Sequence, residues 1–473
     1  MGGILPSMQL RQFVLEGLGH ISALVADDAA GVAVVVDPRR DVDLYLDEAK
    51  ARGLRISHVA ETHLHNDYVS GARELAALSG AAHIHSAGAE LGHPHQPVRD
   101  DESFDVGSLR FRVLETPGHT PEHVSYSVAD VSRADEPQLL FTGGSLLVGA
   151  VGRTDLLGAD HAQAYARQMH ASLHDRLLPH EDSVMVLPTH GGGSLCSKDI
   201  ATTPWSTVGF ERRHDPLLAI DEVEAFVRAL LADQPAFPRY FARMRPTNQA
   251  GPAPLSGVPE PQPLGVEQVR GLLAEEGLVI DARSPEAYAA GHIQGSLSIP
   301  AGSAFGTWLG WIAPHDRPLV LLLDSPDDWD RQIRQALRIG YENVVGYLDR
   351  GLDAWRSSGG HVEAGASISV DQLRAQLDRE PEMLVIDVRQ ASEFEAGHVP
   401  GARHLHAGDL PDRLAELPRD RPIAAICATG YRSSVAAGLL RQAGFSDVSA
   451  VRGGLPDWRA AGYPVQTGEA RSA

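Results

Sequence analysis

The C-terminal half of the chain carries an internal duplication, and this repeat constrains the fold more than any other feature. The segment 278–283 recurs 106 positions later as 384–389, and Gly291-His292-Ile293 recurs at the same offset as Gly397-His398-Val399. Each copy alternates apolar strand-like runs with helical stretches, which predicts a small parallel α/β domain. A period of about 105 residues indicates a duplicated domain, since solenoid repeats are much shorter.

A proline-rich stretch separates this duplicated half from the rest of the chain. Six prolines fall within residues 246–264, a composition that predicts a semi-extended linker. The length of 473 residues agrees with about three domains. We therefore expect an N-terminal domain, a linker, a first repeat copy and a second repeat copy over residues 1–245, 246–264, 265–362 and 366–466.

Composition argues against several kinds of partner. The formal net charge of −21 disfavours nucleic acid and anionic membranes as partners. No apolar stretch approaches the roughly 18 residues of a membrane span. Two cysteines cannot build a disulfide framework, so we expect a reducing, cytoplasmic location. The oligomeric state stays open, a homo-oligomer included.

The second repeat copy contains a candidate nucleophile, Cys427. It follows the apolar run Ile423–Ile426 and precedes a helix that we expect over Ser433–Leu440. The positive end of that helix and the charge of Arg432 would stabilise a thiolate. Further stabilisation is expected from the loop amides of Ala428, Thr429, Gly430 and Tyr431.

The first repeat copy differs at these positions. An ungapped alignment places Leu323 opposite Cys427 and Asp328 opposite Arg432. Its loop, residues 324–328, is acidic and would repel an anionic sulfur donor. We interpret the first copy as a catalytically inactive module that packs, docks or positions.

The loop from Cys427 to Arg432 resembles the active-site loop of rhodanese-type sulfurtransferases, which also runs six residues from Cys to Arg. The Asp-x-Arg and Gly-His elements of both copies are similar to rhodanese modules as well; we interpret Asp387, Arg389 and His398 as residues that brace the fold. The resemblance implies that Cys427 takes up a sulfur atom as a persulfide and passes it to an acceptor thiol or to sulfite.

The N-terminal domain repeatedly places histidines after hydrophobic strands. His63, His65 and Asp67 follow the expected strand Ile56–Ala60, and His119 and His190 lie in two later loops of the same kind. Strand ends that meet at one edge are where α/β proteins assemble their sites. Imidazoles with a carboxylate suit a first-row metal ion such as Zn or Fe.

This pattern resembles the metallo-β-lactamase family, which implies an αββα sandwich followed here by the two parallel α/β modules. His63, His65, Asp67, His119 and His190 fall on that family's metal positions. Tyr68 stands where the full pattern has a histidine, and Gly144 stands where it has a bridging aspartate. We therefore expect at most one ion, in a mononuclear site at His63, His65 and His119. A Gly144→Asp substitution is expected to raise the metal affinity.

The whole chain resembles the persulfide dioxygenase–rhodanese fusions of bacterial sulfide detoxification. The resemblance implies an enzyme that combines sulfur transfer with metal-dependent oxidation of a thiol persulfide, such as glutathione persulfide, to sulfite. Fe(II) is the implied ion, with Zn as the alternative. Two other readings stay open: a thioester hydrolase of glyoxalase II type, and a sulfurtransferase whose N-terminal domain is a scaffold without metal, because Gly144 replaces the expected aspartate.

Several further residues allow a functional or a structural interpretation. Cys196 suits contact with a thiol substrate and a small buried position equally well, and His123 is expected to support His119 from behind. We interpret the histidine-rich stretch around His83, His85, His93 and His95 as a surface loop. A patch for the carboxylate of a glutathione-like thiol is a further hypothesis, on Arg239, Arg243 and Arg245.

Overall fold

The computed structural model describes residues 8–468, which group into two compact units. The first unit holds the described residues up to Val258 together with Leu337–Gly340, and the second holds the others, from Pro259 onward. Within residues 8–468, no helix has both the length and the apolar character needed to cross a membrane.

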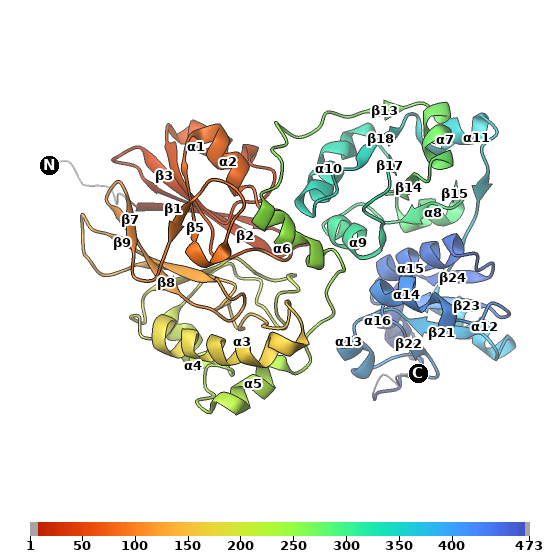
Figure 1. Ribbon diagram of the computed structural model, residues 1–473. Helices are drawn as coiled ribbons and strands as arrows, with labels where there is room; N and C mark the ends of the chain where they lie inside the picture. The colour runs from red at the N-terminus through yellow and green to blue at the C-terminus, as the bar shows by residue number, and fades with distance from the viewer. Residues whose placement is uncertain (1–7, 469–473) are drawn as a thin grey trace. The chain divides into compact units, whose positions relative to one another are not determined.

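The first unit contains two six-stranded sheets that face each other (Figure 1). The first sheet has the order β1 (Met8–Leu15), β2 (His20–Asp27), β3 (Val32–Val36), β4 (Arg55–Ala60), β5 (Ala82–Ser86), β6 (Gln96–Val98). The second has the order β12 (Ser206–Thr207), β11 (Met185–Pro188), β10 (Leu139–Gly143), β9 (Val124–Asp130), β8 (Leu109–Glu115), β7 (Ser103–Val106).

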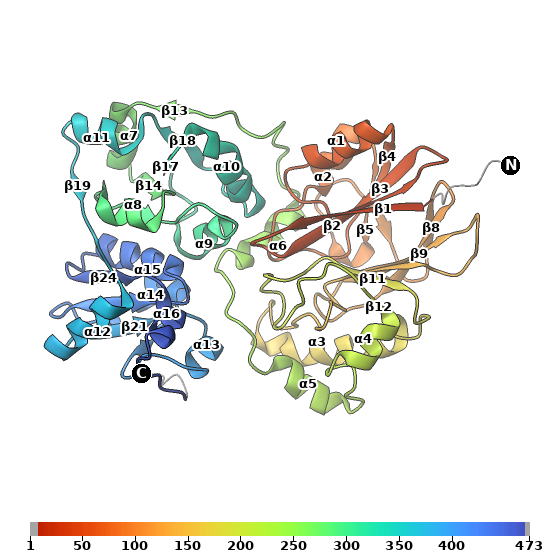
Figure 2. The ribbon, with the colours of Figure 1, turned by 180° about the vertical axis from the view of Figure 1, so that it is seen from behind.

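Helices cover the outer face of each sheet. Apolar residues of α1 (Asp43–Arg52) and α2 (Ala72–Ser79) pack on the first sheet. Those of α3 (Ala159–Ala171) and α5 (Val223–Leu231) pack on the second, and Figure 2 shows α4 (Val208–His214) on that side too. The four layers confirm the predicted αββα sandwich.

Burial along the strands follows from these layers. Every residue of β2 is buried, because β2 lies between the sandwich core on one face and helices on the other. In β8, Phe111 and Val113 point into the core while Arg110 and Arg112 are exposed, the period of two expected for a sheet with one wet face.

The second unit contains two five-stranded sheets with the same strand order, which confirms the duplicated parallel α/β domain. All the pairings are parallel. The first sheet runs β13 (Pro263–Leu264), β18 (Val344–Leu348), β17 (Leu319–Leu322), β14 (Leu278–Asp281), β16 (Leu297–Ser298). The second runs β20 (Ala366–Ile368), β24 (Val448–Val451), β23 (Ile423–Ile426), β21 (Leu384–Asp387), β22 (Arg403–His404).

Helices flank both of these sheets, and a short two-stranded ribbon joins β15 (His292–Ile293) to β19 (Val362–Glu363). The first module has α7 (Val266–Ala274), α8 (Pro285–Ala290), α9 (Phe305–Ile312), α10 (Trp329–Arg338) and α11 (Gly351–Ser357). The second module has α12 (Val370–Arg379), α13 (Ala391–Glu395), α14 (Leu410–Arg413), α15 (Tyr431–Gln442) and α16 (Gly454–Ala460).

The first residues of the expected linker over 246–264 are helical. Residues 246–250 are the second half of α6 (Phe241–Ala250), with Pro246 inside the helix. The helix persists because Asn248 is tied into the first unit: its side-chain amide donates to the carbonyls of His65 and Tyr68, both at 2.9 Å. Tertiary contacts of this kind outweigh the helix-breaking tendency of proline.

We predict that Phe111→Ala lowers the free energy of unfolding of the first unit by about 3–5 kcal/mol. Phe111 is fully buried between the two sheets, with its ring 5.0 Å from that of Phe104. Phe210, which is 52% exposed, provides the control, because Phe210→Ala is expected to change stability by less than about 0.5 kcal/mol. Urea unfolding followed by circular dichroism compares them; equal midpoints would contradict the prediction.

Candidate functional site

The predicted metal-site histidines converge at the edge of the αββα sandwich where several strands end. His63 and His65 follow β4, and His119 and His190 follow β8 and β11. All four are buried. One ligand atom from each of His63, His65 and His190 lies within 4.8 Å of the others, and the same holds for the trio of His119, His190 and Cys196.

Hydrogen bonds to Thr62 and Asp37 fix the orientation of His63. Thr62 donates through its hydroxyl (2.8 Å) and its backbone amide (2.7 Å) to the buried carboxylate of Asp37. The Thr62 oxygen must then accept from Nδ1 of His63, at 2.9 Å. This leaves the lone pair of Nε2 facing the cluster, which is how outer groups usually prepare a metal-binding histidine.

His119 is prepared in the same way. Its Nδ1 donates to the backbone carbonyl of Arg153 at 2.8 Å, so its Nε2 carries a lone pair. That Nε2 is buried and has no hydrogen-bond partner. Burial lowers the pKa of His119 to about 3, which keeps the ring neutral and able to bind a cation. A buried bare nitrogen of this kind points to a missing ion or water.

His190 connects the two trios. Its Nε2 lies 3.4 Å from Nε2 of His63, and its Nδ1 lies 3.2 Å from the carboxylate of Asp67. Two nitrogens bound to one tetrahedral ion at about 2.05 Å would be separated by about 3.3 Å, so the His63–His190 spacing suits a shared ion. Asp67 therefore lies on the Nδ1 side of His190 as an ion-pair contact, and neither of its buried carboxylate oxygens has a hydrogen-bond partner. Although burial opposes it, the neighbouring charge of His190 holds the pKa of Asp67 well below its usual range.

Tyr68 fills the space beside His65. Its ring stacks on that of His65, with centroids 4.4 Å apart, and its hydroxyl donates to the backbone carbonyl of Asp37 at 3.4 Å. Nε2 of His65 faces the Asp37 carboxylate at 3.4 Å, which leaves Nδ1 as the atom available to an ion. Burial raises the pKa of Tyr68 well above normal, so its phenol is not an anionic ligand at neutral pH.

His123 supports the cluster from behind. Its Nε2 accepts from the backbone amide of Gly144 at 2.9 Å, and its Nδ1 lies 2.9 Å from the hydroxyl of Thr116. Its ring stacks on that of His63 with centroids 5.0 Å apart. Both nitrogens are therefore engaged, which leaves none for a metal ion.

The expectation that Gly144→Asp would raise metal affinity does not fit the packing. A β-carbon at position 144 would overlap the imidazole of His119, lying 2.7 Å from its Nε2. The His119 ring occupies the place that an aspartate side chain at position 144 would need, so the substitution would displace this ring. The residues present still fit one metal ion: His63 and His65 form one trio with His190, and His119 forms another with His190 and Cys196.

Two other sequence interpretations change. The stretch of His83 and His85 is not a surface loop, because both lie buried in β5. His83 Nε2 contacts the carboxylate of Glu61 at 2.7 Å. Arg245 is engaged with Glu122 through two hydrogen bonds of 3.0 and 2.8 Å, and Glu122 also accepts from the amide of Leu64. This pair braces the histidine loop instead of offering an anion patch.

The second candidate site lies in the second unit, where Cys427 directly follows β23. The thiol is fully buried, and the backbone amide of Gly430 donates to its Sγ at 3.1 Å. The Ser433 hydroxyl lies 3.7 Å from the same sulfur. Gly430 has φ = 102°, a conformation that favours glycine and turns its amide inward. The other three predicted loop amides show no such bond to Sγ in the described residues.

Arg432 is paired with a neighbouring carboxylate. Its guanidinium is bound by the Glu393 carboxylate through two hydrogen bonds of 2.6 and 2.9 Å. This pairing orients Arg432 but offsets part of its charge. Although burial opposes it, Glu393 and then Cys427 raise the pKa of Arg432, so it stays positive beside the loop.

The first module packs against the Cys427 loop (residues 427–432) of the second. The Tyr431 hydroxyl donates to the carbonyl of Pro300 at 2.8 Å, and the ring of Trp311 in α9 lies 4.8 Å from that of His406. In the first module itself, Leu323 and Asp324 line an open cavity of ≈ 580 Å³ where the second module has its loop. These contacts favour a positioning role for the first module.

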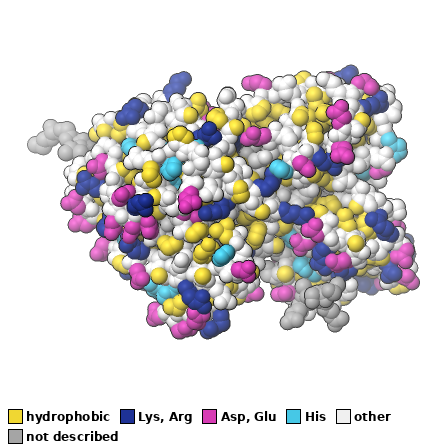
Figure 3. Space-filling view, viewed as in Figure 1, with side chains coloured by type: hydrophobic (Ala, Val, Ile, Leu, Met, Phe, Trp, Pro, Cys, Tyr) yellow, Lys and Arg dark blue, Asp and Glu magenta, His cyan; other side chains and the backbone are white. Residues whose placement is uncertain are grey.

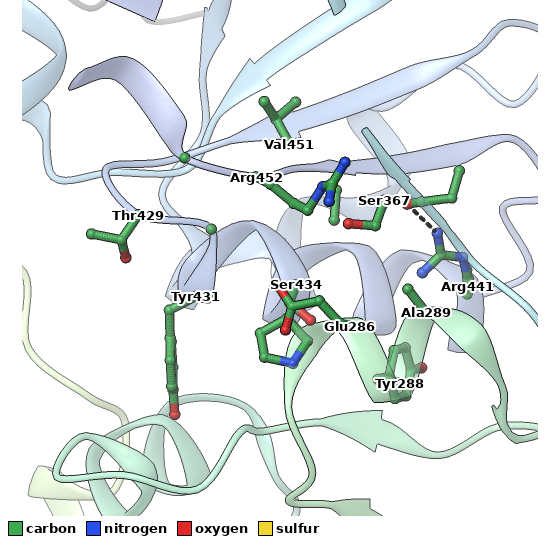
Figure 4. A pocket seen from close by; sticks show the side chains of 15 residues that line it. Glu286, Tyr288, Ala289, Ser367, Thr429, Tyr431, Ser434, Arg441, Val451 and Arg452 are labelled. Atoms are coloured by element: carbon green, nitrogen blue, oxygen red, sulfur yellow. Dashed lines mark hydrogen bonds between the residues drawn. The ribbon is translucent and has the colours of Figure 1, made fainter. Parts of the chain in front are cut away.

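A smaller cavity of ≈ 230 Å³ lies where α8 of the first module meets the Cys427 loop (Figure 4). Thr429 and Tyr431 border it from the loop, and Tyr288 borders it from α8. Arg441 and Arg452 add two guanidinium groups to its lining. The Glu286 carboxylate also lines this space and offsets part of their positive charge.

Sequence reasoning missed the residues that hold the ligands in place. Asp37, Arg153 and Asn248 lie far in sequence from the histidines that they orient. Asp37 ends the strand at Val32–Val36, and an acidic residue at a strand end was the one available signal. The backbone contacts of Arg153 leave no signature in the sequence.

Comparison with known families agrees with this architecture. Residues 17–190 match the metallo-beta-lactamase superfamily, and residues 265–358 and 369–461 each match the rhodanese-like domain. The fold and both sites thus define a metallo-beta-lactamase domain joined to two rhodanese-like modules. The chain belongs to the metallo-beta-lactamase superfamily: the crystal structure of a metallo-beta-lactamase from Staphylococcus aureus is 32% identical, with a TM-score of 0.65, and covers 72% of this chain and 99% of its own.

Curated relatives cover smaller parts of the chain. Human mitochondrial persulfide dioxygenase ETHE1 is 28% identical over 239 residues, 48% of this chain and 83% of that protein. A hydroxyacylglutathione hydrolase of Prochlorococcus marinus is 35% identical over 131 residues, 27% of this chain and 51% of its own. Three uncharacterized mycobacterial proteins share 36% identity over 135 residues, and the chain spans about half of their length (52%).

We predict that Gly144→Ala weakens metal binding roughly tenfold or more, because its methyl group displaces the His119 ring. Gly144→Asp is expected to do the same despite its carboxylate. Gly92→Ala is the matched control, since a β-carbon there meets its nearest neighbour at 3.5 Å. Titration with a competing chelator measures the affinities, and tighter binding by Gly144→Asp would show that His119 moves without loss.

Proposed function

We propose that this protein metabolises sulfane sulfur. The metallo-beta-lactamase domain oxidises a low-molecular-weight thiol persulfide, such as glutathione persulfide, and the second rhodanese-like module transfers sulfur through Cys427. The observation that carries the proposal is the buried Cys427 thiol, which accepts the Gly430 amide at 3.1 Å, in the same chain as a buried cluster of oriented imidazoles. The relationship to persulfide dioxygenases supports the first half of it.

Sulfur transfer at Cys427 follows from nucleophilic displacement. The Cys427 thiolate attacks the outer sulfur of a persulfide or of thiosulfate; a new S–S bond forms, and the donor leaves as a thiolate or as sulfite with the electron pair of the broken bond. The Gly430 amide is placed to stabilise the resulting anion. An acceptor thiol or sulfite then attacks the outer sulfur and regenerates the Cys427 thiolate.

The metal-dependent half would use His63, His65, His119 and His190 to hold one ion, Fe(II) in our proposal and Zn(II) as the alternative. When bound, iron supplies the activation of O₂ next to the persulfide sulfur. One thiol persulfide, one O₂ and one water would give the thiol, sulfite and two protons. The sulfite formed is itself a possible sulfur acceptor at Cys427.

The surface and the cysteines support small-molecule chemistry in a reducing compartment. On the face that Figure 3 shows, Asp and Glu side chains are interspersed with Lys and Arg. Both cysteines are buried and free. We therefore propose thiols and sulfite as the partners, and the cytoplasm as the location.

Thioester hydrolysis is the second candidate for the metal-dependent half. The trio of His63, His65 and His190 favours it, because three imidazoles form a common catalytic zinc site that activates water. The similarity to a hydroxyacylglutathione hydrolase points the same way. Metal identity separates the two candidates, since oxidation requires iron and hydrolysis requires zinc-bound water.

Cys427→Ser should lower sulfur transfer from thiosulfate to cyanide by roughly 10³-fold or more, because the hydroxyl is a far weaker nucleophile. The product thiocyanate provides the measurement. The variant should keep the metal content of the wild type, which shows that the chain is folded. Substantial residual transfer would remove Cys427 from its assigned role.

Anaerobically purified protein should hold at most one tightly bound ion, and His63→Ala should remove it. With iron bound, glutathione persulfide should drive O₂ uptake and sulfite release. His161→Ala, at an exposed position of α3, is the matched control and should keep the ion. Two tightly bound equivalents would refute a mononuclear site. Absence of metal and of O₂ uptake would leave a sulfurtransferase with an inactive N-terminal domain.

A further inference from the structure

Cys196 lies beside the imidazoles of His119 and His190 in the first unit. One atom from each of the three falls within 4.8 Å of the other two. The Cys196 side chain is 1% exposed, and it follows the glycine-rich turn 191–193. The trio is one of only two such clusters among residues 8–468, and it contains the only thiol in either.

The backbone of Arg153 holds Cys196 and His119 together. Its amide donates to the carbonyl of Cys196 at 2.9 Å, and its own carbonyl accepts from Nδ1 of His119 at 2.8 Å. The amide of Cys196 donates to the hydroxyl of Ser194 at 3.1 Å. The backbone of Cys196 is therefore fixed by hydrogen bonds through its amide and its carbonyl, and the bare Nε2 of His119 is buried in the same cluster.

A buried divalent ion held by imidazoles alone needs a negative ligand, because a buried uncompensated charge is costly. Most of the carboxylates around the histidine loops are engaged elsewhere: Asp37 with Thr62 and Thr189, Glu61 with His83, and Glu122 with Arg245. Asp67 is the exception, because neither of its buried oxygens has a hydrogen-bond partner, but its carboxylate lies 3.2 Å from Nδ1 of His190, on the opposite side of the ring from Nε2. Gly144 offers no side chain, and the His119 ring fills the space in front of it.

We propose that the thiolate of Cys196 is a metal ligand, together with His119 and His190, and supplies the negative charge that Gly144 cannot. Coordination forms a metal–sulfur bond and breaks the S–H bond, and the proton leaves to solvent. Imidazole and thiolate together suit Fe(II), Zn(II) and Co(II). The inference rests on the proposed single metal site and adds the identity of its anionic ligand.

His190 is shared between this ligand set and the trio of His63 and His65. It belongs to both trios, so one ion bound through it excludes a second ion at the other trio. His63, whose Nε2 lies 3.4 Å from that of His190, remains close enough to complete a four-ligand shell. The result is a mixed histidine–cysteine site in place of a histidine–carboxylate site.

Substitution with Co(II) tests the ligand directly. The metal-free full-length chain is titrated anaerobically with Co(II) in buffer without thiols, and the thiolate-to-cobalt charge-transfer absorption in the near ultraviolet is recorded. Wild type should show this band with one equivalent of Co(II). Cys196→Ser should lose it and bind Co(II) at least about tenfold more weakly.

Cys427→Ser is the matched control, because Cys196 and Cys427 are the only cysteines of the chain. The band should persist in this variant, and a band that disappears with Cys427 instead would overturn the proposal. X-ray absorption of the wild type needs no variant to fold: one sulfur at about 2.3 Å from the bound ion is expected. A shell of nitrogen and oxygen alone would equally refute it.

These measurements test the assignment of Cys196 as a ligand independently of the proposed persulfide oxidation. An ion bound without sulfur would refute Cys196 as ligand and leave the proposed oxidation of persulfides intact. A sulfur-bound iron without persulfide-dependent O₂ uptake would refute the oxidation and leave the ligand assignment intact. A chain that binds no ion under any condition would refute both.

Discussion

The arrangement of the histidine cluster in the first unit depends on the hydrogen bonds accepted by the buried carboxylate of Asp37. It accepts from the backbone and hydroxyl of Thr62, after β4 of the first sheet, and from the hydroxyl of Thr189, after β11 of the second. The two sheets are therefore tied at the place where their histidines emerge. Burial alone would raise the pKa of Asp37, but contacts with His65 and the threonines hold it below its usual value. The Asp37 carboxylate is therefore ionised at neutral pH.

The sequence was sufficient for the parts of the molecule that follow from periodicity. Alternation of strands and helices predicted both parallel modules, and the repeated pattern of strand then histidine predicted which side chains meet. The limits of α6 could not be found in this way, because Asn248 stabilises a proline-containing helix through contacts with His65 and Tyr68 about 180 residues away. The place of His119 against Gly144 is equally invisible, since it depends on backbone packing between distant loops.

The two rhodanese-like modules show how one scaffold divides into two roles. Strand order is the same in both, yet Cys427 is enclosed by a tight loop in one while Leu323 borders an open cavity in the other. The module without a thiol contributes α9, whose Trp311 packs on His406 near the Cys427 loop. The module without a cysteine thus contributes contacts beside the loop that holds Cys427.

The close approach of Gly144 and Gly152 makes the present arrangement hard to reverse. A β-carbon on Gly152 would overlap the carbonyl oxygen of Gly144, and one on Gly144 would overlap the ring of His119. Return to a carboxylate at position 144 thus requires the imidazole, and the carbonyl of Arg153 that holds it, to move in concert. Position 144 is thus coupled to position 152 and to the His119 loop, so its side chain cannot be enlarged independently of either.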